Sequence, residues 1–155
     1  MSLSRREAIL AALATRLSAD REPARTDMGE ALGTYLDDQG ESSSLEDYEV
    51  ERHVMTVRAE SVHTITTIGT GDDAVIETRA TAANRMLAAL RATAHGGDPT
   101  LGGLCDNIVY TGGGPLLLED PTRYVGAYAS FEIAYTTPVG DPYLPEPEEP
   151  EDPDP

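Results

Sequence analysis

Apolar and polar positions alternate most regularly from Tyr124 to Thr137, in the segment YVGAYASFEIAYTT. A period of two places successive side chains on opposite faces of a β-strand. One face then carries Val125, Ala127, Ala129, Phe131, Ile133 and Tyr135. The pattern predicts a long strand with one buried face. Its expected core residues are Val125, Phe131, Ile133 and Tyr135.

Apolar residues recur at helical spacing in two other segments. In the first, Ser4 and Glu7 have the spacing of a capping box, which predicts a helix that continues to about Ser18. In the second, a helix of about 21 residues is predicted from an N-cap at Asp72 or Asp73 to the glycine pair at 96–97. Its apolar stripe consists of Ile76, Ala80, Ala83, Leu87, Leu90 and Ala94.

The remaining segments predict shorter strands and loops. Residues 30–36 and 49–67 have β-type patterns, and the polar segment 37–45, DDQGESSSL, is typical of a turn or flexible loop between them. Residues 52–54 do not keep one phase of alternation, which indicates a bulge. After the second helix, residues 107–110 predict a short strand, and residues 112–115, GGGP, predict a turn.

The composition changes at Pro138. Residues 138–155 hold seven of the eleven prolines and seven of the 28 acidic residues. Such a segment has few residues to bury and is a poor sheet former, so it is expected to be extended unless a neighbouring subunit orders it. The pattern divides the chain into a domain, residues 1–137, and an acidic Pro-rich C-terminal extension, residues 138–155.

The charge balance restricts the partners. The net charge of −17, from 28 acidic and 11 basic residues, argues against binding to nucleic acid or to an anionic membrane. The same charge is compatible with DNA that passes nearby without binding. No segment approaches the roughly 20 apolar residues of a membrane span, so no membrane partner is expected. The single cysteine cannot form an internal disulfide, which favours a reducing cytoplasm as the site of synthesis.

Candidate catalytic residues are few. His53, His63 and His95 are the possible general bases, and none lies beside a nucleophile or carboxylate at a recognised spacing. Cys105 has the setting of a small buried thiol. The glycines at 112–114 are not followed by the lysine of a phosphate-binding loop. We therefore predict that the chain is not an enzyme and has neither a cofactor nor a metal ion.

Three segments carry a resemblance to a known family. They are YEVERHVMTVRAE at 48–60, DPTLGGLCD at 98–106 directly after the long helix, and ASFEIAYTTP at 129–138. In this order of helix, strands, long helix and closing strand, residues 4–143 resemble the tail terminator (minor tail protein U type) proteins of long-tailed bacteriophages and gene transfer agents.

The resemblance implies an α+β fold in which a mixed β-sheet has two main helices packed on one face. It also implies a virion structural protein at the head-tail junction, made in the host cytoplasm. Its copies would form a homo-oligomer, a hexameric ring that caps the tail tube and ends tube polymerisation. The implied partners are the tail tube protein and the head-side connector or stopper protein, and DNA would cross the lumen without specific binding.

A ring requires two different contact patches on each subunit. The expected subunit or partner interface consists of Leu116, Leu117, Leu118, Pro142, Tyr143 and Leu144, together with the loop at 37–45. The leucines are alternatively expected to pack on their own subunit.

Besides a small enzyme, two other functions remain open from the residues. One is another head-tail connector protein. The other is an acidic cytosolic protein-binding module whose Pro-rich tail, with PxxP spacing at 142–145 and 147–150, binds a partner domain. A small enzyme that uses Cys105 or a histidine is the third hypothesis.

Overall fold

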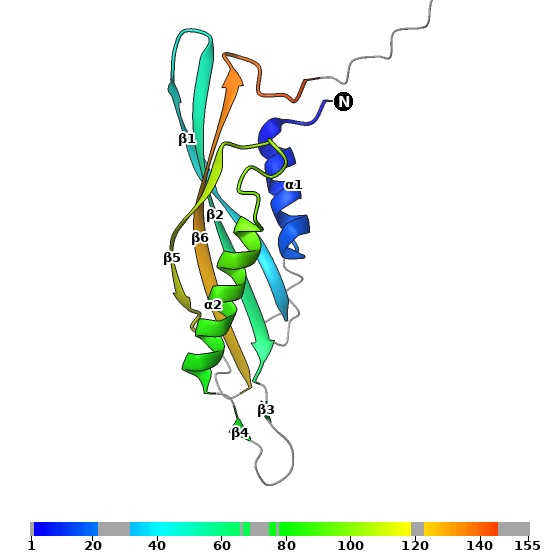
Figure 1. Cartoon of the computed structure of the whole chain (residues 1–155), viewed down its shortest axis with the longest axis vertical. Coiled ribbons are helices and arrows are strands. Elements are labelled where there is room, and N and C mark those ends of the chain that lie inside the picture. The colour runs from blue at the N-terminus through cyan, green and yellow to red at the C-terminus, as the bar shows by residue number, and fades with distance from the viewer. Residues whose placement is uncertain are drawn as a thin grey trace, which may run out of the picture.

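A four-stranded antiparallel sheet forms the centre of the fold in a computed structural model of the chain (Figure 1), which describes residues 2–21, 32–65, 67–68, 75–76, 78–118 and 123–145. The strands β1 (Gly33–Leu45), β2 (Val50–Thr64), β6 (Tyr124–Pro138) and β5 (Asn107–Pro115) lie in that order. The helices α1 (Arg5–Leu17) and α2 (Arg79–His95) pack on the same face of this sheet (Figure 1). A small ribbon pairs β3 (Thr67–Ile68) with β4 (Val75–Ile76). The predicted α+β class with two helices on one face is confirmed.

The predicted mixed sheet is wrong in one respect, because every neighbouring pair of strands in the four-stranded sheet is antiparallel. The passage through α2 does return the chain so that β5 runs in the same direction as β2. However, β6 lies between these two strands and pairs antiparallel with both. Asp20, which follows α1, forms an isolated parallel bridge with Tyr35 of β1.

The core lies between the helices and the facing side of the two central strands. Met55, Val57 and Ala59 of β2 lie opposite Ile133, Phe131 and Ala129 of β6. The α1 residues Ile9, Leu10 and Leu13 cover this layer, and all of these side chains are buried. The alternation predicted for 124–137 is confirmed, since Val125, Phe131, Ile133 and Tyr135 are all buried.

The segment expected to be a loop, residues 37–45, is the second half of β1 and pairs with β2. The prediction was wrong because β1 is an edge strand whose side chains from Asp37 to Leu45 are exposed, so this half of the strand has the polar composition of a loop. Charges on an edge strand disfavour pairing with further strands, so a polar sequence is compatible with this position. The bulge lies here, between Asp38 and Glu41, and not at residues 52–54 as predicted. In β2 the alternation continues through a buried polar residue, His53.

Helix α1 begins as predicted, because the hydroxyl of its N-cap residue Ser4 accepts a hydrogen bond from the Glu7 N–H at 3.1 Å. Helix α2 begins later than predicted. Its N-cap is Thr78, whose hydroxyl accepts from the Thr81 N–H at 3.2 Å, and Ile76 belongs to β4. The expected N-cap residues 72–73 lie outside the described residues. The buried side of α2 is formed by Ala82, Ala83, Met86, Leu90 and Ala94, whereas Ala80 is exposed.

The predicted turn at 112–115 is part of β5, which continues to Pro115 with a bulge between Tyr110 and Gly112. The strand contains glycine at the point where α2 passes close to it. A Cβ atom on Gly113 would lie 2.7 Å from Cδ1 of Leu87 and 2.3 Å from the Tyr128 carbonyl oxygen. Gly113 therefore permits the close approach of helix and strand.

Candidate functional site

The three leucines of the predicted interface follow β5 at one end of the sheet. Leu117 is fully exposed, with a relative exposure of 103%. Leu116 and Leu118 are half-buried. Leu116 packs on its own subunit, because its N–H donates to the Gly126 carbonyl at 2.9 Å and its side chain covers the space beside Gly126. Leu117 is thus the leucine most available to a partner.

The second part of the predicted interface lies at the opposite end of the sheet, beyond the end of β6. Pro142 and Tyr143 are exposed and Leu144 is half-buried. The Pro142 carbonyl accepts from the Arg5 N–H at 2.9 Å, and the Leu144 N–H donates to the Leu3 carbonyl at 3.1 Å. The start of the Pro-rich segment is therefore attached to the N-terminus of its own chain, and the structure does not bring the two predicted patches together.

Cys105 is buried, as the sequence predicts. Its thiol donates a hydrogen bond to the Pro99 carbonyl at 3.4 Å. Burial, and secondarily the charge of Asp106, raises the pKa of Cys105 to about 11. A nucleophilic cysteine needs a lowered pKa, so this environment opposes thiolate chemistry.

Asp98 organises the loop between α2 and β5. Its carboxylate accepts from the Thr100 hydroxyl at 2.6 Å and from the N–H groups of Thr100 and Gly102 at 3.0 and 2.8 Å. These hydrogen bonds lower the pKa of Asp98 to about 2. The carboxylate explains why the DPTLGG segment adopts one defined turn.

We expect the fold to become less stable in acid, because the Asp98 carboxylate of this loop is then protonated. A carboxyl group with a lowered pKa stabilises the folded state above its unfolded pKa, near 3.8, and this stabilisation is lost as the pH falls toward about 2. The free energy of unfolding should therefore drop between about pH 4 and pH 2, and Asp98→Asn should reduce the drop. Urea titrations at several pH values measure it. An identical pH dependence in the variant would contradict the assignment.

His53 joins three strands through its two ring nitrogens. Nδ1 lies 2.6 Å from the Ser43 hydroxyl of β1, and Nε2 lies 2.8 Å from the Thr137 hydroxyl of β6. The ring stacks on Tyr135, with 4.7 Å between centroids. The sequence spacing did not predict this contact between a serine and an imidazole. In a serine hydrolase, however, a carboxylate hydrogen-bonds to the second nitrogen, whereas here the Thr137 hydroxyl occupies that place and the nearest carboxylate oxygen of the described residues, Oε2 of Glu51, lies 3.9 Å away. We interpret the cluster as a cross-strand link.

A second polar cluster connects α1 to the same region. Arg6 forms ion pairs with Asp38 and Glu41, and the Tyr135 hydroxyl donates to Glu41 at 2.6 Å. The hydrogen bond from Arg6 lowers the pKa of Asp38, and burial together with the Glu41 contact raises the pKa of Tyr135. Arg6 lies unfavourably at the positive end of the helix dipole, and these carboxylates offset that position. The cluster anchors the helix to the polar half of β1.

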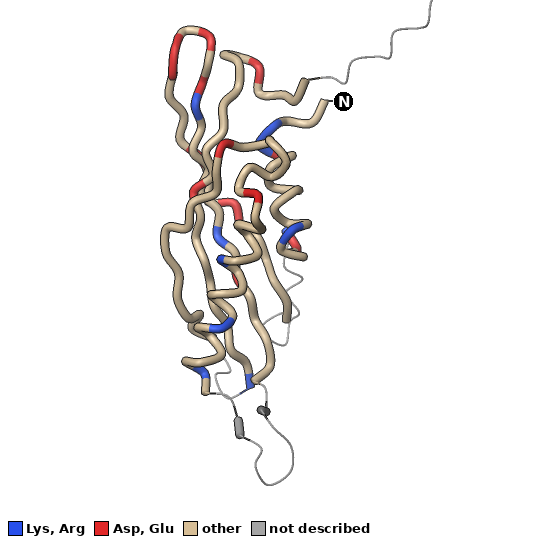
Figure 2. Tube along the Cα trace, viewed as in Figure 1, with Lys and Arg blue, Asp and Glu red and all other residues tan. Residues whose placement is uncertain are grey.

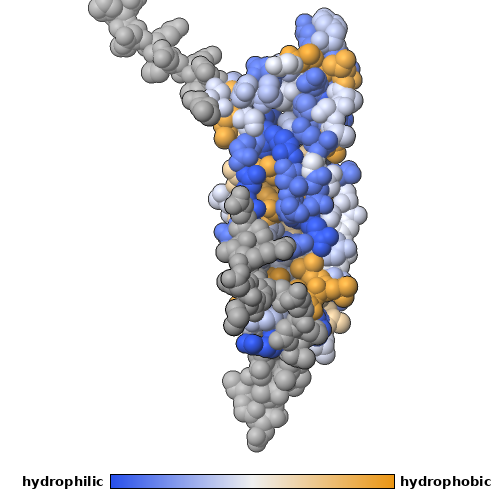
Figure 3. Space-filling model, turned by 180° about the vertical axis from the view of Figure 1, so that it is seen from behind, coloured by the Kyte–Doolittle hydropathy of each residue, from blue (hydrophilic) through white to orange (hydrophobic). Residues whose placement is uncertain are grey.

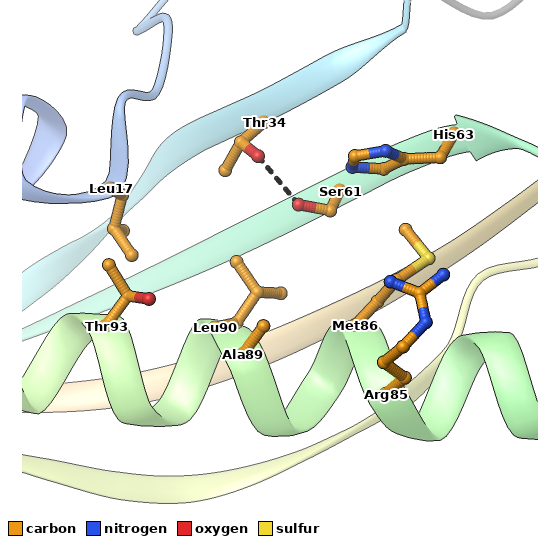
Figure 4. A pocket seen from close by; sticks show the side chains of 9 residues that line it. All are labelled: Leu17, Thr34, Ser61, His63, Arg85, Met86, Ala89, Leu90 and Thr93. Carbon is orange, nitrogen blue, oxygen red and sulfur yellow. Dashed lines mark hydrogen bonds between the residues drawn. The ribbon is translucent and has the colours of Figure 1, made fainter.

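A cavity of about 180 Å³ lies between α2 and the strands β1 and β2 (Figure 4). Thr34 and Ser61 lie side by side on its sheet wall, with their hydroxyl oxygens 2.7 Å apart. His63 and Arg85 lie toward one end of the cavity, and the apolar residues Met86 and Leu90 extend along α2 (Figure 4). The Ser61 hydroxyl is already paired with Thr34, so this cavity does not present a serine activated by a base.

A larger open groove, of about 460 Å³, lies between α2 and β5. Ile108, Tyr110 and Phe131 form its apolar floor. The side that belongs to α2 consists of Ala88, Arg91, Ala92 and His95, which recur at helical spacing on one face. The guanidinium of Arg91 stacks 4.0 Å from the centre of the Tyr110 ring. The small alanines leave the groove open, and its rim is basic.

The β1–β2 hairpin is the most acidic part of the described surface, and it extends beyond the start of α1 (Figures 1 and 2). Residues 41–51 contain five acidic residues and no basic one. Large apolar side chains lie among these charges, since Leu45 is 66% exposed and Tyr48 is 86% exposed. Leu45 is the last residue of the segment 37–45 that was predicted to belong to the interface, whereas Tyr48 was not among the predicted residues. An apolar residue between acidic neighbours in a turn is nevertheless a signal that the sequence contains.

The sheet face away from the helices is largely hydrophilic, and its apolar side chains form separate patches (Figure 3). Arg58 lies 4.0 Å above the Tyr128 ring on this face. Such stacking covers the aromatic surface with a charged group that remains in contact with water. Among the described residues, the apolar side chains of this face therefore do not form a continuous surface.

The comparisons with known proteins do not identify a relative. No protein-family model matches the chain, and no curated protein is significantly similar to it. Within the described ranges, no group of three or more metal-ligating side chains is arranged to hold an ion. Neither of the described helices has the length and apolar character required to cross a membrane.

Proposed function

We propose that the chain is a virion structural protein, a tail terminator whose copies form a ring at the end of the tail tube. In this role the ring ends tube polymerisation and joins the tube to the head-side connector, with DNA passing through its lumen. The observation that most supports the proposal is the arrangement of elements. The order of helix, strands, long helix, glycine-rich segment and closing strand folds into one sheet with both helices on the same face. The antiparallel sheet departs from the mixed sheet that the resemblance implies.

The environments of the reactive side chains support a structural role over an enzymatic one. Cys105 is buried with a raised pKa, and His53 is held between two hydroxyl groups of neighbouring strands. In contrast, the apolar side chains of Leu117 and Tyr48 project into solvent. Exposed apolar side chains of this size are typical of contact surfaces.

The binding-module alternative is less well supported. A PxxP ligand has to present an extended segment with a free backbone to its partner. The 142–145 motif instead uses its backbone to pair with residues 3–5 of the same chain. The second motif, at 147–150, lies outside the described residues.

We expect Leu117→Ser to weaken ring formation or tube capping without unfolding the domain. The side chain is fully exposed, so its replacement should change the free energy of unfolding by less than about 0.5 kcal/mol. The measurement is the length distribution of tail tubes assembled from the tail tube protein of the same virion, with and without the full chain. Wild type should yield tubes of limited length, and the variant should allow longer ones.

Leu32→Ser is the matched control, because Leu32 is also exposed, at 54%, and lies outside the predicted interface. It should limit tube length as wild type does. If the wild-type chain has no effect on tube length and does not bind tube ends, the terminator proposal fails. If Leu117→Ser caps tubes normally, the terminator proposal stands and Leu117 is not part of the contact.

A further inference from the structure

We propose that the acidic β1–β2 hairpin of one copy docks in the basic groove between α2 and β5 of the next copy. Tyr48 would enter the groove, and the acidic residues around it would face Arg91 and His95. This inference rests on the proposed ring, and it names the contact from which the ring is built.

The hairpin tip has a defined shape although it is exposed. The Asp47 carboxylate accepts from the N–H groups of Glu49 and Val50 at 2.7 and 2.9 Å, and the Glu46 N–H donates to the Val50 carbonyl at 2.9 Å. The Glu49 carbonyl also accepts from the Val139 N–H at 2.9 Å. An ordered tip loses little conformational freedom on binding, which favours a specific contact. Tyr48 is therefore presented to solvent by a preorganised turn.

The groove has the complementary chemistry. Its floor is apolar and aromatic, and its volume of about 460 Å³ lies in the range, about 300 to 1,000 Å³, that is usual for binding pockets. A tyrosine ring can bury its apolar area there while its hydroxyl stays near the polar rim. Tyrosine and arginine are also the residues that most often dominate the energy of protein interfaces.

Charge complementarity selects a second copy as the occupant. Helix α2 contains three arginines and no acidic residue, in a chain of net charge −17 (Figure 2). The acidic and basic surfaces belong to different elements of the same chain. Patches of this kind produce a heterologous, head-to-tail contact, and such contacts close into rings when the rotation between copies allows it.

Each of two variants removes one half of the contact. Tyr48→Ala removes the inserted side chain, and Ala88→Leu fills the groove at an exposed position of α2. Each should weaken self-association about 30-fold, the usual result of truncating a central interface residue. Ala80→Leu, the same substitution at an exposed position of α2 outside the groove, should associate as wild type does.

Mixing the variants tests the head-to-tail arrangement. The Ala88→Leu chain keeps an intact hairpin and the Tyr48→Ala chain keeps an intact groove, so a 1:1 mixture should form pairs and stop there. Sedimentation velocity over a concentration series measures this, with wild type growing beyond two chains. Arg91→Glu alone should reduce association. The double variant Glu49→Arg with Arg91→Glu should restore it, because the two charges that face each other are then both reversed and attract again.

The outcomes separate the contact from the function. The proposed contact is overturned if the wild-type chain stays monomeric or stops at a dimer. It is also overturned if Tyr48→Ala and Ala88→Leu each associate as well as wild type does. If association follows the prediction but tail tubes grow without limit in the presence of the chain, the contact stands and the terminator function fails.

Discussion

Gly113→Ala is expected to destabilise the fold by about 2 to 3 kcal/mol, which is large for the addition of one methyl group. The new Cβ would lie 2.3 Å from the Tyr128 carbonyl oxygen of β6 and 2.7 Å from Cδ1 of Leu87 on α2. The first of these atoms belongs to the backbone of the paired strand and cannot rotate away. Relief therefore requires β5 to separate from β6 or α2 to move outward, and both changes disturb packing against the sheet.

Gly114→Ala provides the matched control. A Cβ atom at this neighbouring position would lie 3.7 Å from the Tyr128 ring, which is an ordinary contact, and the substitution should change the free energy of unfolding by less than about 1 kcal/mol. Urea unfolding followed by circular dichroism measures both variants. Equal stabilities would show that Gly113 is farther from β6 and α2 than the structure places it.

The elements that the sequence predicts correctly are those determined by neighbouring residues. The N-cap Ser4 contacts Glu7 three positions away, and the alternation from Tyr124 to Thr137 reports directly on one buried face. The prediction that Cys105 is buried is correct for a similar reason, because a small thiol next to a leucine usually lies in apolar surroundings.

The incorrect predictions concern residues whose structure depends on partners in neighbouring strands. Residues 37–45 have the composition of a loop, yet their backbone pairs with β2 at the sheet edge. His53 interrupts the apolar pattern of β2, but Ser43 and Thr137 satisfy its two nitrogens, so it is buried in phase with Met55. A periodicity analysis treats such a residue as exposed, because it contains no information about the neighbouring strands.

Of the candidate surfaces, the sequence predicts one and does not reveal the other. The exposure of Leu117 follows from its place among consecutive leucines in a polar connection, and it was among the predicted interface residues. The groove depends on Ala88 and Ala92 facing Tyr110 of a strand that lies later in the chain. Alanine on a helix is equally common at exposed and buried positions, so its sequence pattern does not reveal a groove.

Arg16→Met is expected to destabilise the fold by about 2 kcal/mol, because it uncaps the end of α2. Nη1 of Arg16, on α1, donates to the carbonyls of Ala94, His95 and Asp98 at 3.0, 3.1 and 2.6 Å. These carbonyls include the last ones of α2, which have no partner within the helix. The positive charge also lies at the negative end of the helix dipole.

Gly96 makes this capping possible. It has a φ of +56°, and a Cβ atom there would lie 3.0 Å from Cδ of Arg16. Glycine is therefore favoured both by the left-handed backbone and by the approach of the guanidinium. The contact links the two helices on the sheet, so its loss should loosen α1 as well as the end of α2.

The magnitude is tested against two further variants in urea titrations. Arg79→Met removes the same charge from an exposed position in the first turn of α2, where arginine opposes the helix dipole, and should leave stability within about 0.5 kcal/mol of wild type. Arg16→Lys keeps the charge without the planar guanidinium and should recover only part of the loss. If Arg16→Met is as stable as Arg79→Met, water replaces the guanidinium at the three carbonyls without loss, and the capping contact contributes nothing to the fold.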